Sequence, residues 1–269
     1  MESLPSKDER AGSFGAVAAH YERFRPGPPS VAIGWWLPDR VARVVDLGAG
    51  TGALTRLLVD RVDEVIAVEP DARMRAVLRE QVPAATAVDG RGESLPLPDA
   101  STDAVLASSS WHWVDPVAAV AEAARVLVPG GLLGAIWSGP DPEGPFLAQA
   151  RDLLGHRAEP AADEVGFGDL IFDESLRPEF VLRIPEGLPF SEPEHEVFTW
   201  DVALDADELI GLLETFSWYI TLAPERREQV SATARRLLGE LGIEGDVTVD
   251  VGFRADAWRS RRELLRHTS

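Results

Sequence analysis

The feature that most constrains the fold is a regular alternation of short apolar runs with helical stretches, which begins near Val41. The runs VVDL, VIAV, AVLA and LLGAI are almost entirely apolar, and stretches such as ARMRAVLREQV and PVAAVAEAARVL separate them. Strands joined by helices of this length form right-handed crossovers in a parallel sheet, and strands covered on both faces need apolar side chains throughout. The alternation therefore predicts an α/β protein with a mostly parallel sheet and helices on both faces.

The alternation sets the limits of an expected core over residues 41–138, in which the stretch between Val82 and Thr102 is expected to be a loop. Before this core, residues 1–40 contain the helical stretch SFGAVAAHYERF, which a cluster of prolines and a glycine from Pro26 to Pro29 should end. We expect residues 1–40 to form an N-terminal helical cap.

The pattern changes after Ser138, where proline and acidic residues replace the alternation. Residues 139–196 are expected to be an insertion after the fifth strand, which either covers a pocket as a lid or forms an exposed loop. Residues 197–269 contain two strand patterns, FTWDVAL and DVTVDVGFRADAWRS, with two helical patterns between them. This last segment is expected to complete the sheet.

Composition disfavours several kinds of partner and site. The formal net charge of −19, with Lys7 as the only lysine, disfavours nucleic acids and anionic membranes as partners. The chain has no cysteine, and its histidines lack metal-ligand spacing, so we expect no metal site. The sequence shows neither a leader peptide nor a membrane-spanning run, which favours a cytoplasmic protein, and it does not indicate an oligomeric state.

The strongest local motif is VVDLGAGTG, where an apolar strand turns into a helix. Glycines in such a turn supply positive φ angles and let the backbone approach a ligand closely. The second strand ends in Glu69, an acidic residue at the position where a ribose can be held by its hydroxyl groups. The order is D-x-G-x-G-x-G, whereas dinucleotide sites prefer G-x-G-x-x-G, so the motif favours a ligand with a sugar and without a phosphate. Asp46 lies beneath the turn, where its carboxylate could orient water or the amino group of a zwitterionic ligand.

In these motifs the sequence resembles the class I S-adenosylmethionine-dependent methyltransferases, most closely the bacterial small-molecule enzymes with a "methyltransferase type 11" core. The resemblance covers residues 13–138 strongly and depends on FGAVAAHYERFRPGPP, VVDLGAGTG, VIAVEPDARM and GRGESLPLPDASTDAVLASSSWHWVDP, which leads into AEAARVLVPGGLL. It implies a Rossmann-like seven-stranded sheet and S-adenosyl-L-methionine as cofactor, with S-adenosyl-L-homocysteine as product. It also implies methylation of oxygen, nitrogen or carbon on a small-molecule substrate, with specialised metabolites among the candidate substrates.

The resemblance also implies roles for individual residues in binding the cofactor. Tyr21 and Arg25 match a Y-x-x-x-R-P stretch that folds over the cofactor, with the arginine on the methionine carboxylate; alternatively, Tyr21 only packs and Arg25 only caps its helix. Glu69 would hold the ribose, and Glu93 the adenine amino group, unless Glu93 is simply a solvated loop residue. The other expected cofactor residues are Asp46, Gly48, Ala49, Gly50, Pro70, Met74, Gly92 and Ser108.

The acceptor should bind beyond the end of the fourth strand, at SSSWHWVDP, because ligands of open α/β sheets lie at the carboxyl ends of the strands. His112 is the candidate general base, since imidazole titrates near neutral pH; its alternative role is structural. Tryptophans can form an aromatic pocket for a sulfonium cation or a flat substrate, or they can belong to the core. The candidates for substrate binding are Trp35, Trp36, Trp111, Trp113 and Trp218.

Two other functions remain as alternatives to methyl transfer. The same fold can bind S-adenosylmethionine and catalyse a non-methylating reaction such as cyclisation. An NAD-dependent oxidoreductase is disfavoured, because the chain lacks the dinucleotide glycine pattern and a tyrosine-lysine or cysteine dyad. A hydrolase is disfavoured because no serine lies in a G-x-S-x-G turn.

Overall fold

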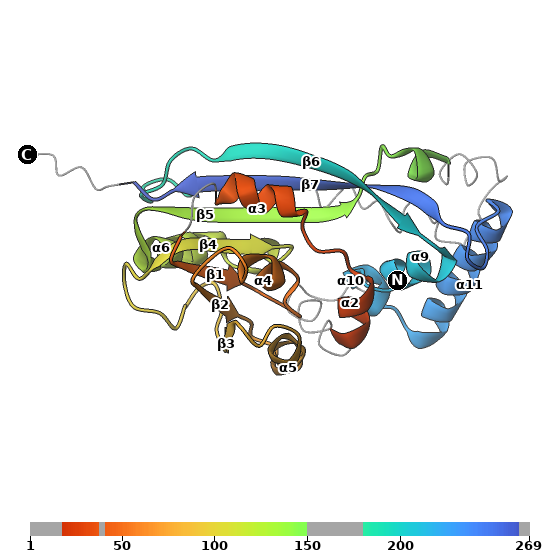
Figure 1. Cartoon of the computed structure of the whole chain (residues 1–269), viewed down its shortest axis with the longest axis horizontal. Helices are drawn as coiled ribbons and strands as arrows, with labels where there is room; N and C mark the ends of the chain where they lie inside the picture. The colour runs from red at the N-terminus through yellow and green to blue at the C-terminus, as the bar shows by residue number, and fades with distance from the viewer. Residues whose placement is uncertain (1–17, 38–40, 150–179, 264–269) are drawn as a thin grey trace, which may run out of the picture. The chain divides into compact units, whose positions relative to one another are not determined.

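The computed structural model describes residues 18–37, 41–149 and 180–263, and its strands form one seven-stranded sheet in the order β3-β2-β1-β4-β5-β7-β6 (Figure 1). The pairs β1–β2, β1–β4, β2–β3 and β4–β5 are parallel. The strands are β1 (Arg43–Leu47), β2 (Glu64–Val68), β3 (Thr86–Val88), β4 (Thr102–Ser108), β5 (Leu127–Pro140), β6 (Glu194–Leu204) and β7 (Val249–Arg261).

The strand β7 runs antiparallel to β5. Near the start of β5 the Gly130 N–H donates to the Arg262 carbonyl, and just beyond its end the Asp141 N–H donates to the Gly252 carbonyl. The start of one strand therefore lies beside the end of the other. The sheet is mixed but mostly parallel, which confirms the predicted Rossmann-like α/β fold.

Helices connect the strands, and several begin at a side-chain cap. Asp71 caps α5, Asp115 caps α6, and Asp205 forms a capping box with Glu208 at the start of α9. Each cap satisfies backbone N–H groups that the first helical turn leaves without a partner. The helices are α2 (Ala18–Phe24), α3 (Ser30–Trp36), α4 (Ala53–Leu58), α5 (Ala72–Gln81), α6 (Pro116–Val126), α9 (Ala206–Leu213), α10 (Ser217–Ile220) and α11 (Pro224–Glu240), with a 3₁₀ turn, η2, at Trp111–Trp113. No helix among the described residues is long and apolar enough to cross a membrane.

The chain divides into two compact units, each made from segments that are distant in the sequence. Unit 1 comprises residues 1–25, 139–178 and 199–254, and unit 2 comprises residues 26–138, 179–198 and 255–269. The strands β5, β6 and β7 contribute residues to both units. These boundaries differ from the four consecutive segments expected from the sequence, because the cap, the insertion and the C-terminal segment are each divided between the units.

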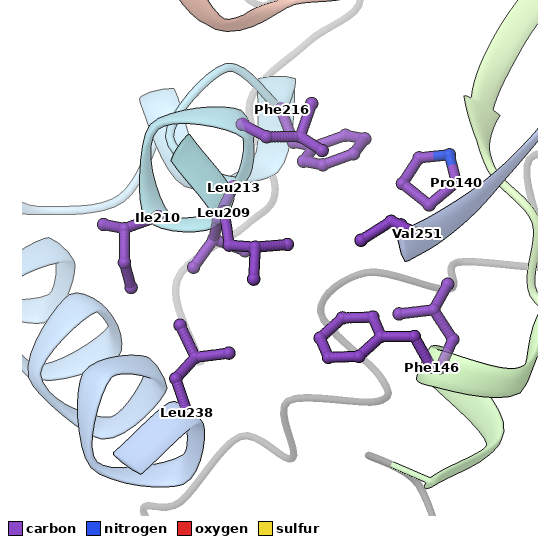
Figure 2. A pocket seen from close by; sticks show the side chains of 10 residues that line it. Pro140, Phe146, Leu209, Ile210, Leu213, Phe216, Leu238 and Val251 are labelled. Atoms are coloured by element: carbon purple, nitrogen blue, oxygen red, sulfur yellow. The ribbon is translucent and has the colours of Figure 1, made fainter. Parts of the chain in front are cut away.

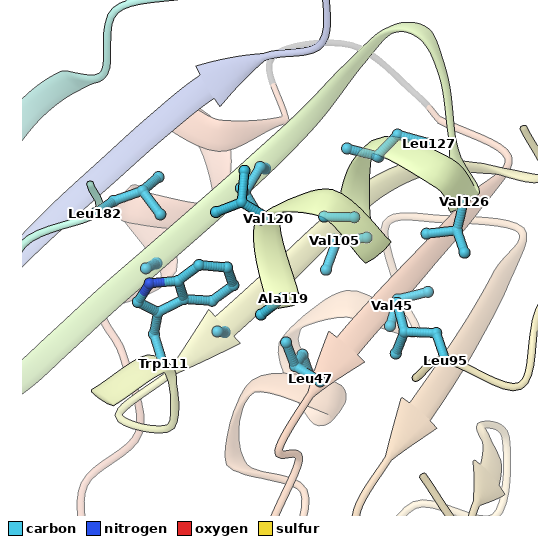
Figure 3. Close-up of a cluster of buried hydrophobic side chains, with 14 of the residues drawn as sticks. Val45, Leu47, Leu95, Val105, Trp111, Ala119, Val120, Val126, Leu127 and Leu182 are labelled. Carbon is cyan, nitrogen blue, oxygen red and sulfur yellow. The ribbon is translucent and has the colours of Figure 1, made fainter. Parts of the chain in front are cut away.

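The core of unit 2 has side chains on both faces of the parallel strands. On one face Val45, Val105 and Leu133 pack with Val120 of α6 in the cluster that Figure 3 shows. On the other face the Trp36 ring of α3 packs so closely over Gly134 that a Cβ at this glycine would lie 2.9 Å from it. Burial on both faces is the reason that these strands are apolar throughout.

The edges of the sheet differ from the sequence expectation. The stretch between Val82 and Thr102, expected to be a loop, contains β3, a three-residue edge strand whose side chains are partly or fully exposed. Such a strand has too few buried positions to give an apolar pattern. At the other edge β6 begins at Glu194, inside the segment expected to be an insertion, and alternates exposed with partly buried residues.

Candidate active site

The glycine-rich turn between β1 and α4 is held by backbone hydrogen bonds to the neighbouring strand. The N–H groups of Gly48 and Ala49 donate to the Val68 carbonyl at 2.8 and 3.1 Å. The φ angles of Gly48, Gly50 and Gly52 are +66°, +57° and +100°. At Gly48 a Cβ would lie 2.5 Å from the Ser110 Cβ, so both the conformation and the space require glycine at this position.

Asp46 lies directly beneath this turn and is 1% exposed. Its Oδ2 accepts a hydrogen bond of 2.5 Å from the Thr55 hydroxyl, whereas Oδ1 is buried and has no hydrogen-bond partner among the described residues. Burial, with a smaller contribution from the nearby Glu69 carboxylate, raises the pKa of the Asp46 carboxyl to about 7, although the hydrogen bond from Thr55 lowers it. An unpaired buried carboxyl oxygen costs free energy, so a donor from a ligand would be favourable here.

Glu69 follows the last residue of β2 and links the glycine turn to the start of α5. Its Oε2 accepts from the Gly50 N–H at 2.9 Å and its Oε1 from the Asp71 N–H at 2.8 Å, with 8% of the residue exposed. Burial raises the pKa of this carboxyl, although the two backbone bonds favour its charged form. The carboxylate is thus fixed in one orientation, and each oxygen keeps a lone pair for a ligand hydroxyl.

The residues expected at the adenine lie just before α5, on α5 and on the loop after β3. Met74 is buried, whereas Pro70 is exposed. Gly92 is closely covered, since a Cβ there would lie 2.8 Å from Val114. Glu93 accepts a hydrogen bond of 2.7 Å from the Asp115 N–H, so one carboxylate oxygen positions the start of α6. A contact with adenine would use the remaining acceptor capacity of Glu93.

Comparison with known proteins identifies the family. A family model described as "Methyltransferase domain" matches residues 45–135. An uncharacterised methyltransferase of Mycobacterium tuberculosis is 38% identical over 87% of this chain and 88% of its own length. The chain belongs to the class I S-adenosylmethionine-dependent methyltransferases. Its cofactor is therefore S-adenosylmethionine, which confirms the prediction made from the glycine motif and the resemblance.

Two further matches are more distant from this methyltransferase. A malonyl-[acyl-carrier protein] O-methyltransferase of Enterobacter lignolyticus is 35% identical, over 48% of this chain and 54% of its own length. The solved structure of Haemonchus contortus phosphoethanolamine N-methyltransferase 2, in complex with phosphomonomethylethanolamine and S-adenosylhomocysteine, covers 98% of this chain and 61% of that chain. Its TM-score is 0.52 at 14% identity, so this likeness shows the fold alone.

The residues of the methyltransferase fit the cofactor at the carboxyl ends of β1 and β2. The unpaired Asp46 Oδ1 suits a donor such as an ammonium group. No atom of the described residues lies within 4 Å of the Cβ position at Gly50, which leaves room above the turn. At the next strand, the remaining acceptor capacity of Glu69 would suit ribose hydroxyls. Among the described residues no group of three or more potential metal ligands lies together.

His112 lies in the 3₁₀ turn after β4, and its hydrogen bond argues against the predicted role as general base. Its Nδ1 accepts from the Trp137 Nε1–H at 3.0 Å. Because this lone pair is used, the proton of the neutral ring belongs on Nε2, and His112 is better suited to donate a hydrogen bond than to accept a proton. Rings surround it: Trp113 at 4.5 Å and Phe180 at 5.4 Å between centroids, with Phe180 stacked on Trp137 at 5.5 Å.

The tryptophans proposed to bind substrate occupy different environments. Trp36 and Trp111 are 1% and 4% exposed and belong to the core, which argues against direct contact with substrate. The Trp36 Nε1–H donates to the Trp258 carbonyl at 3.0 Å. Trp35 is partly exposed and lies 4.1 Å beneath the guanidinium of Arg259. Trp113 remains a candidate through its contact with His112.

Three other predicted residues belong to unit 1, whereas the glycine turn belongs to unit 2. Tyr21 lies in α2, and Arg25 follows the last residue of that helix. The Arg25 guanidinium lies 4.7 Å from the centre of the Phe216 ring. Trp218 lies in the short helix α10. Their expected roles in binding cofactor and substrate stay predictions.

Four residues near the site were missed by sequence reasoning. Ser110 donates to the Leu47 carbonyl and contacts the glycine turn, and Thr55 donates to Asp46. Trp137 and Phe180 contact His112 from positions that are distant in the sequence. Thr55 could have been found from its place one helical turn after the glycines, and Ser110 lies inside the predicted SSSWHWVDP motif but was given no role there. No local pattern marks Trp137 or Phe180. Ser108, which was predicted, is the last residue of β4 and is partly buried.

Proposed function

We propose that this methyltransferase transfers the methyl group to an oxygen, nitrogen or carbon of a small molecule that binds beyond the carboxyl end of β4. The observation that carries the proposal is the ring cluster around His112, which lies directly after that strand. Small ligands of open α/β sheets bind at this edge. The net charge of −19 supports a small acceptor over a nucleic acid or a membrane surface.

S-adenosylmethionine, when bound, supplies a methyl group on a positively charged sulfur, and the sulfur is the leaving group when the acceptor attacks the methyl carbon in line. The chain then needs mainly to align the acceptor and exclude water. The imidazole of His112, oriented by its hydrogen bond from Trp137, would border the acceptor and help to align its reacting atom with the methyl group. The rings of Trp113 and Phe180 would cover its apolar part.

The proposed mechanism does not require a protein base. The Nδ1 of His112 accepts from Trp137, so proton transfer to that atom would break a hydrogen bond of 3.0 Å. The arrangement suits acceptors that are nucleophilic without losing a proton to the protein during attack, such as a carboxylate or a neutral amine. The relative from Enterobacter lignolyticus is an O-methyltransferase by name, but its match covers only half of each chain. We therefore leave the acceptor atom open.

The test is to incubate the protein with S-adenosylmethionine labelled in its methyl group and an extract of the source cells. The extract is separated into low-molecular-weight, protein and RNA fractions. We expect label in the low-molecular-weight fraction, and His112→Ala should reduce the rate there with unchanged affinity for S-adenosylmethionine. Label only in the protein or RNA fraction would refute the small-molecule acceptor, and an unchanged rate in His112→Ala would refute the role of the imidazole.

A further inference from the structure

The two units differ in what they bury. In unit 1 a void of about 20 Å³, the room of one water-sized sphere, is lined by apolar side chains such as Phe146, Leu213 and Leu238 (Figure 2). Such a void belongs to ordinary packing. Unit 2 instead buries a cation: Arg75 of α5 is 9% exposed, and no other arginine or lysine among the described residues is buried as deeply.

The guanidinium of Arg75 lies at the carboxyl ends of β2 and β3. Its Nη1 donates to the backbone carbonyl of Glu69, which follows β2, at 2.5 Å, and to the carboxylate of Asp89, which follows β3, at 3.2 Å. Its Nε–H is buried and has no hydrogen-bond partner among the described residues. A buried charge with an unpaired donor costs free energy, so stability alone does not account for an arginine at this position.

We propose that Arg75 is a positioning residue for the cofactor, which holds Glu69 in the orientation that receives the ribose hydroxyls. Arg75 fixes Glu69 through its backbone carbonyl. The N–H groups of Gly50 and Asp71 fix the two carboxylate oxygens. Main chain and side chain are thus both held, and the remaining lone pairs keep one direction. This role rests on the placement of the ribose at Glu69 and does not depend on the identity of the acceptor.

The charge of Arg75 acts on the same carboxylate. Burial raises the pKa of the Glu69 carboxyl, the neighbouring Asp71 carboxylate adds to this, and the guanidinium of Arg75 lowers it. Asp46 of β1 also interacts with Glu69 as a like charge. The side chain of Asp89 is 73% exposed, so water screens its charge and the guanidinium stays effective on Glu69. Loss of the guanidinium should therefore raise the pKa of Glu69.

The test compares adenosine with 2′,3′-dideoxyadenosine, which lacks both ribose hydroxyls, by calorimetric titration of the full chain. Adenosine carries no ammonium group, so the ligand does not engage the carboxylate of Asp46. Arg75→Met should bind adenosine about ten-fold more weakly, the lower limit for losing a hydrogen bond to a charged group, and dideoxyadenosine within about two-fold of the wild type. Glu69→Ala should show the same selective loss. A merely structural role of Arg75 would weaken the binding of both nucleosides equally.

Arg79→Met is the matched control. It is the same substitution one turn later in α5, at an exposed arginine whose Nη2 donates to the Ala87 carbonyl at 3.1 Å, and both affinities should stay unchanged. As pH falls, adenosine affinity should be lost at a higher pH in Arg75→Met than in the wild type, because Glu69 takes up its proton earlier. Arg75→Lys, which keeps the charge, should restore the wild-type profile.

The possible failures have different meanings. Equal losses for the two nucleosides, or a pH profile that Arg75→Met leaves unchanged, would overturn the positioning role. If Arg75→Met does not fold, Arg75→Gln, which keeps a donor without the charge, decides by the same comparison and the same pH profile. Unchanged adenosine affinity in Glu69→Ala would instead refute the placement of the ribose. None of these results bears on the acceptor, so a failure here is distinguishable from a failure of the proposed function.

Discussion

Replacing Gly48 with alanine tests how tightly the cofactor turn is packed. Gly48 has a φ angle of +66°, which costs an L-residue about 1–2 kcal/mol. The new Cβ would also lie 2.5 Å from the Ser110 Cβ and 2.9 Å from its Oγ, and overpacking of this kind costs about 1–3 kcal/mol. The free energy of unfolding should therefore fall by about 2–5 kcal/mol.

Gly50→Ala is the matched control. Its φ angle is +57°, but no atom of the described residues lies within 4 Å of the Cβ position, so only the conformational cost of about 1–2 kcal/mol applies. The effect of alanine on the unfolded chain is the same in both variants and cancels in the comparison. The two variants should thus differ by about 1–3 kcal/mol, which is the overlap with Ser110.

Urea unfolding followed by tryptophan fluorescence measures both variants, together with Ser110→Gly and the double variant Gly48→Ala/Ser110→Gly. Removing the serine side chain relieves the overlap, so the double-mutant cycle should give a favourable coupling of about 1–3 kcal/mol. Equal stabilities of Gly48→Ala and Gly50→Ala, or zero coupling with Ser110→Gly, would refute the close packing of the turn against the end of β4.

Three further predictions concern buried groups. The pKa of Asp46 is raised from 3.8 to about 7, so between these pH values the folded state holds a proton that the unfolded state has lost. The free energy of unfolding of the wild type, relative to Asp46→Asn, should therefore fall by roughly 4 kcal/mol as pH rises from about 4 to about 7. An increase in this difference with pH, measured by urea unfolding, would contradict the prediction. Nitrogen-15 NMR should find neutral His112 with its proton on Nε2; a proton on Nδ1 would be incompatible with the hydrogen bond from Trp137. Trp36→Phe should lower the free energy of unfolding by about 1–3 kcal/mol, because it loses the hydrogen bond to Trp258 and leaves a small cavity. Its affinity for S-adenosylmethionine should stay within about two-fold of the wild type. A large loss of affinity would show that Trp36 binds the ligand after all.

The parallel half of the sheet was predictable because its signals, apolar runs and helix caps, lie within short stretches of the sequence. The strands β1, β2, β4 and β5 are buried on both faces, so each contains an apolar run. Two of the helices between them, α5 and α6, begin at aspartates, Asp71 and Asp115, which are recognisable as caps in the sequence. The glycine turn is also local, since its φ angles depend on residue type. The edge strand β3 was missed because it is short and largely exposed.

The candidate site was predictable only where a residue's role follows from its place in a motif. Asp46 and Glu69 lie at the carboxyl ends of β1 and β2, and hydrogen bonds connect Glu69 to the glycine turn and Asp46 to the helix that follows it. The role of a tryptophan, by contrast, depends on packing against distant segments: Trp36 is core because Gly134 lies beneath it. The role of His112 depends on the hydrogen bond that its Nδ1 accepts from Trp137. Because Trp137 is 25 positions away in the sequence, no local pattern indicates that bond.

The most direct test of the account is calorimetric titration of the wild type and Glu69→Ala with S-adenosylmethionine, S-adenosylhomocysteine and NAD as separate ligands. Asp60→Ala, at an exposed acidic residue after α4, is the control. We expect the wild type and Asp60→Ala to bind the first two ligands at about micromolar strength and not NAD. Glu69→Ala should bind them about ten-fold or more weakly, because the charge-assisted contact to the ribose is lost. Binding of NAD alone, binding of nothing, or unchanged affinity in Glu69→Ala would contradict the cofactor site at the carboxyl ends of β1 and β2.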